Sequence, residues 1–429
     1  MSSFTVHCRC GEAFHVNDAA IGRHVVCRRC GNVTEVTRPA VAETRADPTA
    51  ARAPKLRRKR RNSARPATPS RQPMMVPMTG LARILSWAVW AYLGAVIVIA
   101  ALMWTLGDRA IVGSILLFMG RWVFLLPLAL LLPAALWLRR DRLPHLIVAA
   151  AIVLGPIMGF RTGWRRALPH PAGLPVRVAT FNTEGGGVLA QLLPGMLDRW
   201  GAQIVAFQEC GESLAAATSQ LTGWYHHEEK DLCLLSRYPI RRAEIMDRSG
   251  LDRVKQSESK EIGGAGYVVR FVLDGPRGPI RVANLHLETP RKGFEGLMDR
   301  DLRRIRMNTE IRDVESHLAR AWVDTGTGPL VVLGDFNTPV ESRIFRDHWG
   351  DLADAFSTAG FGLGMTKYNG WIRARIDHVL TSDDWHVDRV RIGPDAYSDH
   401  RPLLVDLTLT GASARPQRAA GSVSVKTEP

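Results

Sequence analysis

An uncharged apolar stretch near the front of the chain constrains its fold more than any other feature. LSWAVWAYLGAVIVIAALMWTL, residues Leu85–Leu106, is long enough to cross a bilayer, which takes about 20 apolar residues. Two shorter apolar runs follow, so that we expect helices over about residues 85–106, 121–138 and 143–160. Three such runs, flanked by Trp and Arg, favour a transmembrane region over residues 81–163 rather than a buried helical hairpin. The first run begins too far into the chain for a cleavable signal peptide.

Arginine placement predicts the orientation of these helices. The basic segment KLRRKRR at residues 55–61 precedes the first run, and RRDR at residues 139–142 separates the second from the third. Because loops rich in Lys and Arg stay on the cytoplasmic side of a membrane, the N-terminus and the second loop are predicted to be cytoplasmic. Three crossings then place everything after Phe160 on the outer side of the plasma or inner membrane. A two-span topology, which WRR at residues 164–166 favours, would reverse that side. The short run AIVGSILLFMG is expected to be interfacial or an extension of the second helix.

The charge of the chain is unevenly distributed. The formal net charge is +15, but residues 1–170 hold 24 Lys and Arg against 7 Asp and Glu, whereas residues 171–410 hold 29 against 33. The C-terminal part therefore has no excess charge that would hold a nucleic-acid duplex by counterion release. Residues 37–80, rich in Pro, Ala and Arg, are predicted to be a disordered linker that touches anionic lipid, with nucleic-acid binding as the alternative. Residues 411–429 are predicted to be a disordered tail.

Residues 1–36 form a small module with two cysteine pairs, Cys8 with Cys10 and Cys27 with Cys30. Two such pairs resemble a zinc ribbon, in which four thiolates hold one Zn²⁺. The first pair has a one-residue gap, which departs from the ribbon pattern. Three histidines therefore stay open as ligands: His7, His15 and His24. Two disulfides are the alternative, which a cytoplasmic location disfavours. Four protein ligands leave no position for chemistry, so we expect a structural role or a cytoplasmic protein partner.

From residue 174 onward, short β-rich runs alternate with polar, partly helical segments, which predicts a single α/β domain over residues 174–410. Residues Leu297–Trp322 are predicted to form one long amphipathic helix. Cys210 and Cys233 lie in or beside apolar strands and are expected to be inert core residues.

Several of these strands end in polar side chains that could carry chemistry. Taken singly, an Asp or Asn after a strand is usually a turn or a cap, and a lone His is usually a spectator. Together, four acids, two amides and two histidines at strand ends would converge on one rim of a sheet, which suits a divalent cation and proton transfer. The residues concerned are Asn182, Glu209, His286, Asp335, Asn337, Asp377, Asp399 and His400.

The order of these pieces resembles the endonuclease/exonuclease/phosphatase superfamily. FN, QE, LLSRYPI, NLHLE, GDFN, IDHVL and SDHRP appear in family order over residues 174–410, and GDFN followed by SDH is the most specific part. The resemblance implies a two-layer β-sandwich flanked by helices, a four-layer α/β/β/α fold, with the site at the open edge of the sandwich. It also implies a Mg²⁺ (or Mn²⁺) ion held mainly by Glu209, with Asn182 and Asp399 beside it directly or through water.

The resemblance implies catalytic roles as well. Asp335 would orient or deprotonate the attacking water, and Asn337 would bind phosphoryl oxygens. His400, oriented by Asp377, would contact the scissile phosphate, and His286 would stabilise the phosphate or help the leaving group. The chemistry agrees, because an anionic phosphodiester repels hydroxide and its hydrolysis needs a cation, an aligned nucleophile and donors for developing charge.

Three further positions bear on the branch of the superfamily. His286 stands where apurinic-site endonucleases tend to have tyrosine, so it is more similar to the deoxyribonuclease, sphingomyelinase and phosphatase branches. Glu184 is assigned no role. Arg291 and Lys292 of TPRKG could reach a substrate phosphate, or form a solvated basic turn.

These features predict a membrane-anchored, metal-dependent phosphoesterase that hydrolyses a phosphodiester. A phospholipid headgroup, a small phosphodiester and nucleic acid, the last only as substrate, all stay open. The alternative is a membrane adaptor or sensor, in which the zinc ribbon binds a partner and the C-terminal domain binds a ligand without catalysis.

Overall fold

The computed structural model describes residues 3–7, 13–17, 21, 24–26, 33–36, 80–251, 266–370 and 372–411. The chain forms two compact units, Met1–Met75 and Val76–Pro429. In the first unit two pairs of strands are antiparallel: β1 (Ser3–His7) with β2 (Ala13–Asn17), and β3 (His24–Val26) with β4 (Val33–Glu35). The four cysteines predicted to bind zinc, most of the predicted linker and the predicted tail lie outside the described residues, so the ribbon stays a prediction.

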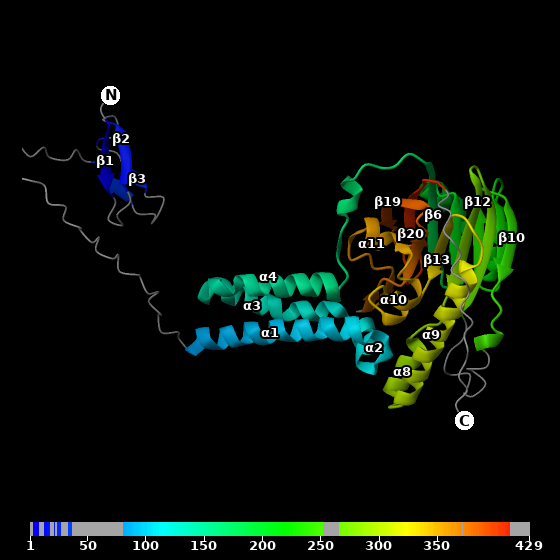
Figure 1. Cartoon of the computed structure of the whole chain (residues 1–429), viewed down its shortest axis with the longest axis horizontal. Helices are drawn as coiled ribbons and strands as arrows, with labels where there is room; N and C mark the ends of the chain where they lie inside the picture. The colour runs from blue at the N-terminus through cyan, green and yellow to red at the C-terminus, as the bar shows by residue number, and fades with distance from the viewer. Residues whose placement is uncertain are drawn as a thin grey trace, which may run out of the picture. The chain divides into compact units, whose positions relative to one another are not determined.

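The second unit begins with three apolar helical segments that lie side by side (Figure 1). They are α1 (Gly80–Thr105), α3 (Leu126–Leu138) after a 3₁₀ segment from Arg121, and α4 (Leu143–Ile152), which continues as a π-turn to Ile157. In the described part of the chain, Gly80–Thr105 and Arg121–Leu138 are long and apolar enough to cross a membrane, whereas the third segment is shorter. Their outer faces expose large apolar side chains, including Leu130 at 76% and Trp137 at 84%. Such a surface needs an apolar partner.

The segment between α1 and α3 packs against the C-terminal domain. α2 (Ile111–Phe118) is a helix of its own rather than an extension of the second apolar helix, and Phe118 packs edge-to-face on Phe294. Asp108 caps α10 (Arg343–Trp349): its carboxylate accepts a hydrogen bond from Ser342 Oγ at 2.6 Å and from the backbone N–H of Arg343 at 2.9 Å. Since Asp108 is buried, it is part of the domain's interior.

A buried arginine makes a second attachment at the same end of the helices. Arg121 Nη1 donates to the carbonyl of Ile157 at 2.7 Å and to Glu341 Oε2 at 3.0 Å. Trp104 Nε1 donates to the carbonyl of Pro156 at 3.3 Å. The end of α1, the beginning of the Arg121–Leu138 helix and the end of the α4 segment therefore meet where the C-terminal domain begins.

The C-terminal domain contains two six-stranded mixed sheets. Sheet one has the order β10 (Ile240–Ile245), β11 (Tyr267–Gly275), β12 (Gly278–His286), β13 (Leu330–Asp335), β18 (Asp377–Thr381) and β14 (Ala353–Asp354). Sheet two has the order β19 (Trp385–Ile392), β20 (Leu403–Leu409), β6 (Leu174–Asn182), β7 (Ile204–Gln208), β9 (Leu232–Ser236) and β8 (Tyr225–Glu229). The pairs β12–β13 and β6–β7 are parallel and the other pairs are antiparallel.

Alternating side chains explain how the layers form. In β6, Val178 faces the core between the two sheets, whereas Phe181 faces α5 (Leu189–Trp200) and α6 (Glu212–Ser219). In β13, Val331 faces the inter-sheet core and Val332 faces α9 (Leu302–Asp324) and α10. Because strand side chains alternate, one apolar strand serves two layers. The predicted arrangement of two sheets flanked by helices is confirmed.

One predicted element is wrong in detail. Instead of one helix over Leu297–Trp322, the chain forms α8 (Arg291–Met298) and then α9. Arg300 breaks the helix with a φ of +60°, and Asp301 Oδ1 begins the next one by accepting from the backbone N–H groups of Arg303 and Arg304. An N-cap of this kind satisfies donors that would otherwise be unpaired.

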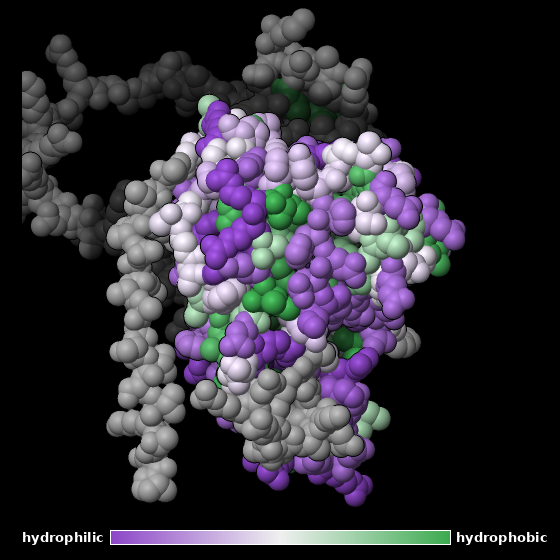
Figure 2. Space-filling view, turned by 90° about the vertical axis from the view of Figure 1, so that its right-hand side faces the viewer, coloured by the Kyte–Doolittle hydropathy of each residue, from purple (hydrophilic) through white to green (hydrophobic). Residues whose placement is uncertain are grey.

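The remaining short elements are α11 (Ala355–Ala359), β5 (Arg161–Thr162) paired with β15 (Phe361–Gly362), and β16 (Lys367–Asn369) paired with β17 (Ile372–Ala374). Seen from the side away from the apolar helices, the domain surface is mostly hydrophilic with small hydrophobic patches (Figure 2).

Candidate active site

The strand register brings the predicted site residues to one edge of the sandwich. In sheet one, Asp335 at the end of β13 pairs with His286 on one side and with Asp377 on the other. In sheet two, Asn182 at the end of β6 pairs with Gln208, and Glu209 follows directly. Polar ends of apolar strands thus lie next to one another at this edge.

Asp335 lies at the centre of this group and is almost completely buried. Its Oδ1 accepts a hydrogen bond from the backbone N–H of Asn337 at 2.8 Å. Its Oδ2 accepts from Asn182 Nδ2 at 3.1 Å, and the same amide nitrogen donates to Glu209 Oε1 at 2.9 Å. Asn182 therefore links the acids of the two sheets.

Two Asp–His pairs flank Asp335. On one side His400 Nδ1 is 2.8 Å from Asp377 Oδ2, and His400 Nε2 is 3.6 Å from Asp335 Oδ2. On the other side His286 Nδ1 is 2.9 Å from Asp231 Oδ2, and His286 Nε2 is 3.9 Å from Asp335 Oδ2. Each imidazole is oriented by one carboxylate and turns its second nitrogen towards Asp335.

Burial and charge act in opposite directions on these groups. Burial lowers the pKa of His286, but the hydrogen bond that its Nδ1–H donates to Asp231 and the charges of Asp335 and Glu209 outweigh burial and raise that pKa to about 9. The pKa of His400 is also raised, because Asp377 and Asp335 outweigh burial. Burial and the charge of Asp377 raise the pKa of Asp335 against the opposing effect of the two histidines. Both imidazoles thus favour the protonated form in this set of charges.

The oxygens at the outer part of the edge fit a hard divalent cation. Glu209 and Asp399 supply carboxylates, and Asp399 Oδ1 is buried without a hydrogen-bond partner among the residues that the structure describes. Its other oxygen pairs with Lys367. Asn182 now turns Nδ2 to the acids while its Oδ1 accepts from the Glu184 N–H at 3.1 Å, so ligation through Oδ1 requires the amide to turn over. A carboxylate and amide set of this kind is the donor chemistry that Mg²⁺ prefers.

Two residues of the site have a left-handed backbone. Glu209 has a φ of +49° and Asn337 a φ of +50°, which is unfavourable for residues other than glycine. Asn337 is held by its Nδ2, which donates to the carbonyl of Leu287 at 2.8 Å, and its own carbonyl accepts from Arg312 at 3.3 Å. Strain maintained by such contacts is typical of functional positions.

Cys210 and Cys233 are buried in the core, as expected, and they also form a disulfide with an S–S distance of 2.01 Å, which was not predicted from the sequence. Cys210 directly follows Glu209, and its N–H donates to the carbonyl of Asp231 at 2.9 Å. The bridge therefore joins the strand end that carries Glu209 to the hairpin that carries Asp231. Both cysteines are buried, so apolar neighbours alone did not reveal the pairing.

Sequence reasoning missed three residues near the site: Asp231, Lys367 and Glu184. Asp231 directly precedes an apolar strand, as Asp377 does at the beginning of β18, so the strand-end pattern could have found it. Glu184 Oε2 accepts from the backbone N–H of Asp399 at 3.2 Å and supports that turn. Lys367 offered no signal, because it lies outside every apolar run.

Arg291 and Lys292 lie in the first turn of α8, where both pair with Glu295, at 3.8 and 3.6 Å. These contacts and the 74% exposure of the Arg291 side chain match a solvated basic turn.

A protein-family model described as the Endonuclease/Exonuclease/phosphatase family matches residues 179–400. No curated protein sequence matches the chain. Among solved structures, an endonuclease/exonuclease/phosphatase from Beutenbergia cavernae is similar at 16% identity and a TM-score of 0.43, covering 56% of this chain and 73% of that one. A family protein from Bacteroides thetaiotaomicron is similar at 16% identity and a TM-score of 0.40, covering 56% and 96%. A 3′ phosphatase, NExo, from Neisseria is similar at 18% identity and a TM-score of 0.40, covering 54% and 98%.

Proposed function

Because the chain belongs to the Endonuclease/Exonuclease/phosphatase family, we propose that it is a membrane-anchored hydrolase that cleaves a phosphodiester with the help of a divalent cation. Members of this superfamily are typically phosphoester hydrolases that use divalent metal ions. The observation that carries the proposal is the convergence of two Asp–His pairs and Glu209 on the buried Asp335. A domain that only binds a ligand would have no need of two oriented imidazoles beside a buried carboxylate.

Asp335 is proposed to hold the attacking water and to take its proton. Burial raises the pKa of this carboxyl and makes the group a better base than a solvated aspartate. Its Oδ1 is held by the backbone N–H of Asn337, so that the orientation of the carboxylate is fixed before substrate arrives. A preoriented base is more effective because the reacting geometry needs no further ordering.

The two imidazoles are proposed to bind the phosphate from opposite sides. His400, held by Asp377, would donate Nε2–H to a phosphoryl oxygen, and His286, held by Asp231, would donate to the phosphate or the leaving oxygen. The pKa of His286, raised to about 9, keeps this imidazole charged near neutral pH, and the pKa of His400 is raised as well, which suits donors to an anion. Asn337 would complete the set of donors to the phosphoryl group.

Glu209, Asp399 and Asn182 are proposed to hold the cation, Mg²⁺ or Mn²⁺. When bound, the ion would supply positive charge for the phosphoryl oxygens and the leaving group. Asp399 Oδ1, which is buried and accepts no hydrogen bond among the described residues, and the strained backbone of Glu209 support the assignment of these two residues.

The apolar segments are proposed to cross the membrane three times. The C-terminal domain contacts Asp108 and Arg121, which flank the loop between the first two apolar helices. With two crossings that loop and the domain would lie on opposite sides of the bilayer, and these contacts could not form. With three crossings the loop and the domain lie on the same side of the membrane. The distribution of arginines predicts that this is the outer side. The Cys210–Cys233 disulfide supports that side, since disulfides persist in oxidising compartments.

The activity is tested with the full chain purified in detergent, with an aryl phosphodiester, a phospholipid and single-stranded DNA as substrates, each with Mg²⁺ and with a chelator. We expect Mg²⁺-dependent hydrolysis of at least one substrate, lost in Asp335→Ala. Asp198→Ala, which alters an exposed acid on α5, is the matched control and should retain activity. Hydrolysis that is equal in Asp335→Ala and wild type would exclude this function.

The topology is tested separately by a reporter fused after Pro429 that is active on only one side of the membrane. We expect activity on the outer side. A cytoplasmic signal would overturn the three-crossing arrangement without affecting the proposed chemistry.

A further inference from the structure

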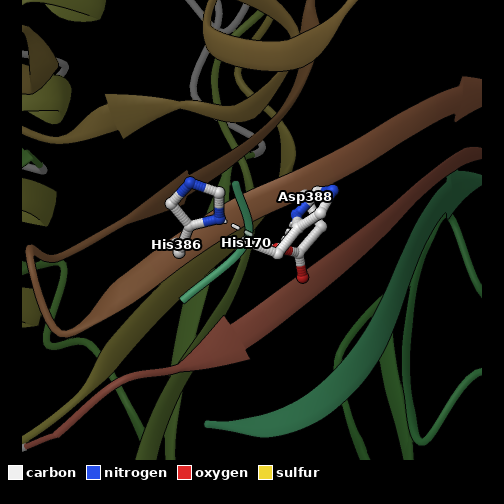
Figure 3. Close-up of side chains that lie close together, drawn as sticks. All are labelled: His170, His386 and Asp388. Atoms are coloured by element: carbon white, nitrogen blue, oxygen red, sulfur yellow. Dashed lines mark hydrogen bonds and ion pairs between the residues drawn. The ribbon is translucent and has the colours of Figure 1, made fainter. Parts of the chain in front are cut away.

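Three side chains of types that commonly bind metal ions meet at the end of sheet two that is remote from Asn182. His386 and Asp388 project from the outer face of β19, and His170 reaches them from the connector between the last apolar segment and β6 (Figure 3). His386 pairs with Thr408, which in turn pairs with Pro175 near the beginning of β6. We call His170, His386 and Asp388 the surface cluster.

Both imidazoles of the surface cluster direct their Nδ1 atom at the same carboxylate oxygen of Asp388. His170 Nδ1 and His386 Nδ1 each lie 2.9 Å from Asp388 Oδ1. The rings stand almost perpendicular, at 89°, with centroids 5.8 Å apart. The other carboxylate oxygen, Oδ2, accepts from Thr408 Oγ1 at 2.7 Å. A third group therefore orients the carboxylate, as neighbouring residues commonly orient metal ligands.

The local fold builds this convergence. The register between β19 and β20 shifts between Val387 and Arg389, so Asp388 sits in a bulge and has no partner residue on β20. His170 stands between two prolines, which restrict the backbone on both sides. The connector then approaches β20 at Gly173, where a Cβ would lie 2.4 Å from both Leu409 O and Thr408 Cγ2.

The donor set matches zinc better than magnesium. Imidazole nitrogen and carboxylate oxygen are ordinary Zn²⁺ ligands, whereas Mg²⁺ prefers oxygen alone. A tetrahedral ion with bonds of about 2.0–2.1 Å places its ligand atoms about 3.3 Å apart, so each 2.9 Å contact would widen by only a few tenths of an ångström. The side chain of His170 is 53% exposed and that of His386 is 33% exposed, so water can reach a fourth position.

We propose that His170, His386 and Asp388 bind one Zn²⁺ ion, with water as its fourth ligand, and that this ion ties the connector to the catalytic sandwich. One ligand comes from the connector and two come from β19. The site is distinct from the N-terminal cysteine module and lies at the opposite end of sheet two from Glu209. Loss of the ion would release the connector at the point where it enters β6.

The proposal is tested by zinc binding to the full chain in detergent, with excess Mg²⁺ present to occupy oxygen sites. Bound zinc per chain is measured by elemental analysis after equilibrium dialysis at a series of buffered free Zn²⁺ concentrations. We expect His170→Ala and His386→Ala each to bind one Zn²⁺ per chain fewer than wild type. His226→Ala, which removes an exposed histidine from β8 in the same sheet, should bind as much as wild type. Zinc held by the cysteine module is common to all variants and cancels.

A spectroscopic measurement keeps the test valid if a variant is poorly folded. Co²⁺ in the surface cluster would show the visible bands of tetrahedral nitrogen and oxygen ligation without the thiolate charge-transfer band of a cysteine site. We expect these bands to be lost in His386→Gln and kept in His226→Gln. Equal zinc content in wild type and His386→Ala, or a difference that appears only at millimolar free zinc, would overturn the proposal.

Discussion

The C-terminal domain carries two groups of His and Asp side chains, and these groups differ chiefly in burial. Asp335, Asp377 and His400, the buried cluster, are at most 2% exposed, whereas all three side chains of the surface cluster reach solvent. In the buried cluster each charge shifts the pKa of its neighbours, because the low dielectric strengthens their interaction. In the surface cluster water weakens such coupling. The same residue types therefore suit proton transfer and anion binding at one end, and metal capture at the other.

The largest expected contrast is catalytic. His400→Ala should lower the rate of phosphodiester hydrolysis by about 100- to 1000-fold, because removing one positioned donor to developing negative charge commonly costs that much. His386→Ala should retain activity within about twofold. Turnover of both variants at saturating Mg²⁺ gives the comparison, and equal losses would mean that the two ends of the sandwich do not have separate roles.

Removal of one carboxylate from each cluster should separate them in stability. Asp377→Ala leaves His400 buried without its carboxylate partner. This change should lower the free energy of unfolding by about 3–5 kcal/mol. Asp388→Ala breaks partly exposed contacts and should cost about 1 kcal/mol or less in zinc-free buffer. Denaturant unfolding of the full chain in detergent measures both; a cost at Asp388 that matched that at Asp377 would contradict the contrast in burial.

The pH dependence of stability should come from the buried end. The pKa of His286 is raised to about 9, so the folded chain holds this proton more tightly than the unfolded chain, whose histidine titrates near 6.5. The resulting stabilisation is complete below pH 6.5 and is lost as pH rises through 9, a change of about 3 kcal/mol.

Unfolding with a chelator present, at intervals between pH 6 and 10, measures this slope. His286→Gln should reduce this slope, leaving the part that comes from His400, and His386→Gln should leave the slope unchanged. If His286→Gln retained the full slope, the charge pair with Asp231 would not be its source.

A smaller difference between variants is expected from stabilisation by zinc. A ligand at ten times its Kd stabilises the folded state by about 1.4 kcal/mol. Zinc at that level should raise the unfolding free energy of wild type by that amount more than that of His170→Ala. Thermal unfolding with and without Zn²⁺ gives the difference, and an identical shift in both proteins would place the zinc elsewhere.

The sequence could predict the buried cluster because its residues share one local pattern, a polar side chain at the end of an apolar strand. Strand register then brings Asp335 beside both His286 and Asp377 without further information. The layered fold follows from the same apolar runs, since alternating side chains cover both faces of each sheet.

The surface cluster, the disulfide and the cap on α10 could not be predicted, because they depend on contacts between segments that are distant in the sequence. The surface cluster joins His170 to residues more than 200 positions later, through a bulge that no local pattern marks. The disulfide joins Cys210, two residues after the end of β7, to Cys233 in β9, and a free thiol would fit either apolar position equally well. The carboxylate that caps α10 belongs to Asp108. It accepts a hydrogen bond from the backbone N–H of Arg343, which lies 235 residues later in the chain. Tertiary packing determines such pairings, and they cannot be predicted from the local propensity of either segment.

The Asp108 cap makes the apolar segment a structural part of the catalytic domain rather than a flexible leash. Asp108 and Arg121 satisfy the N-terminal groups of α10 and the buried carboxylate of Glu341, so a domain cut free at residue 171 would lose both partners. If the helices span a bilayer as proposed, the catalytic edge stands at one height and one tilt above the lipid. A domain held in this way would select substrates by where their phosphodiester lies relative to the membrane surface, before any side chain of the site recognises them.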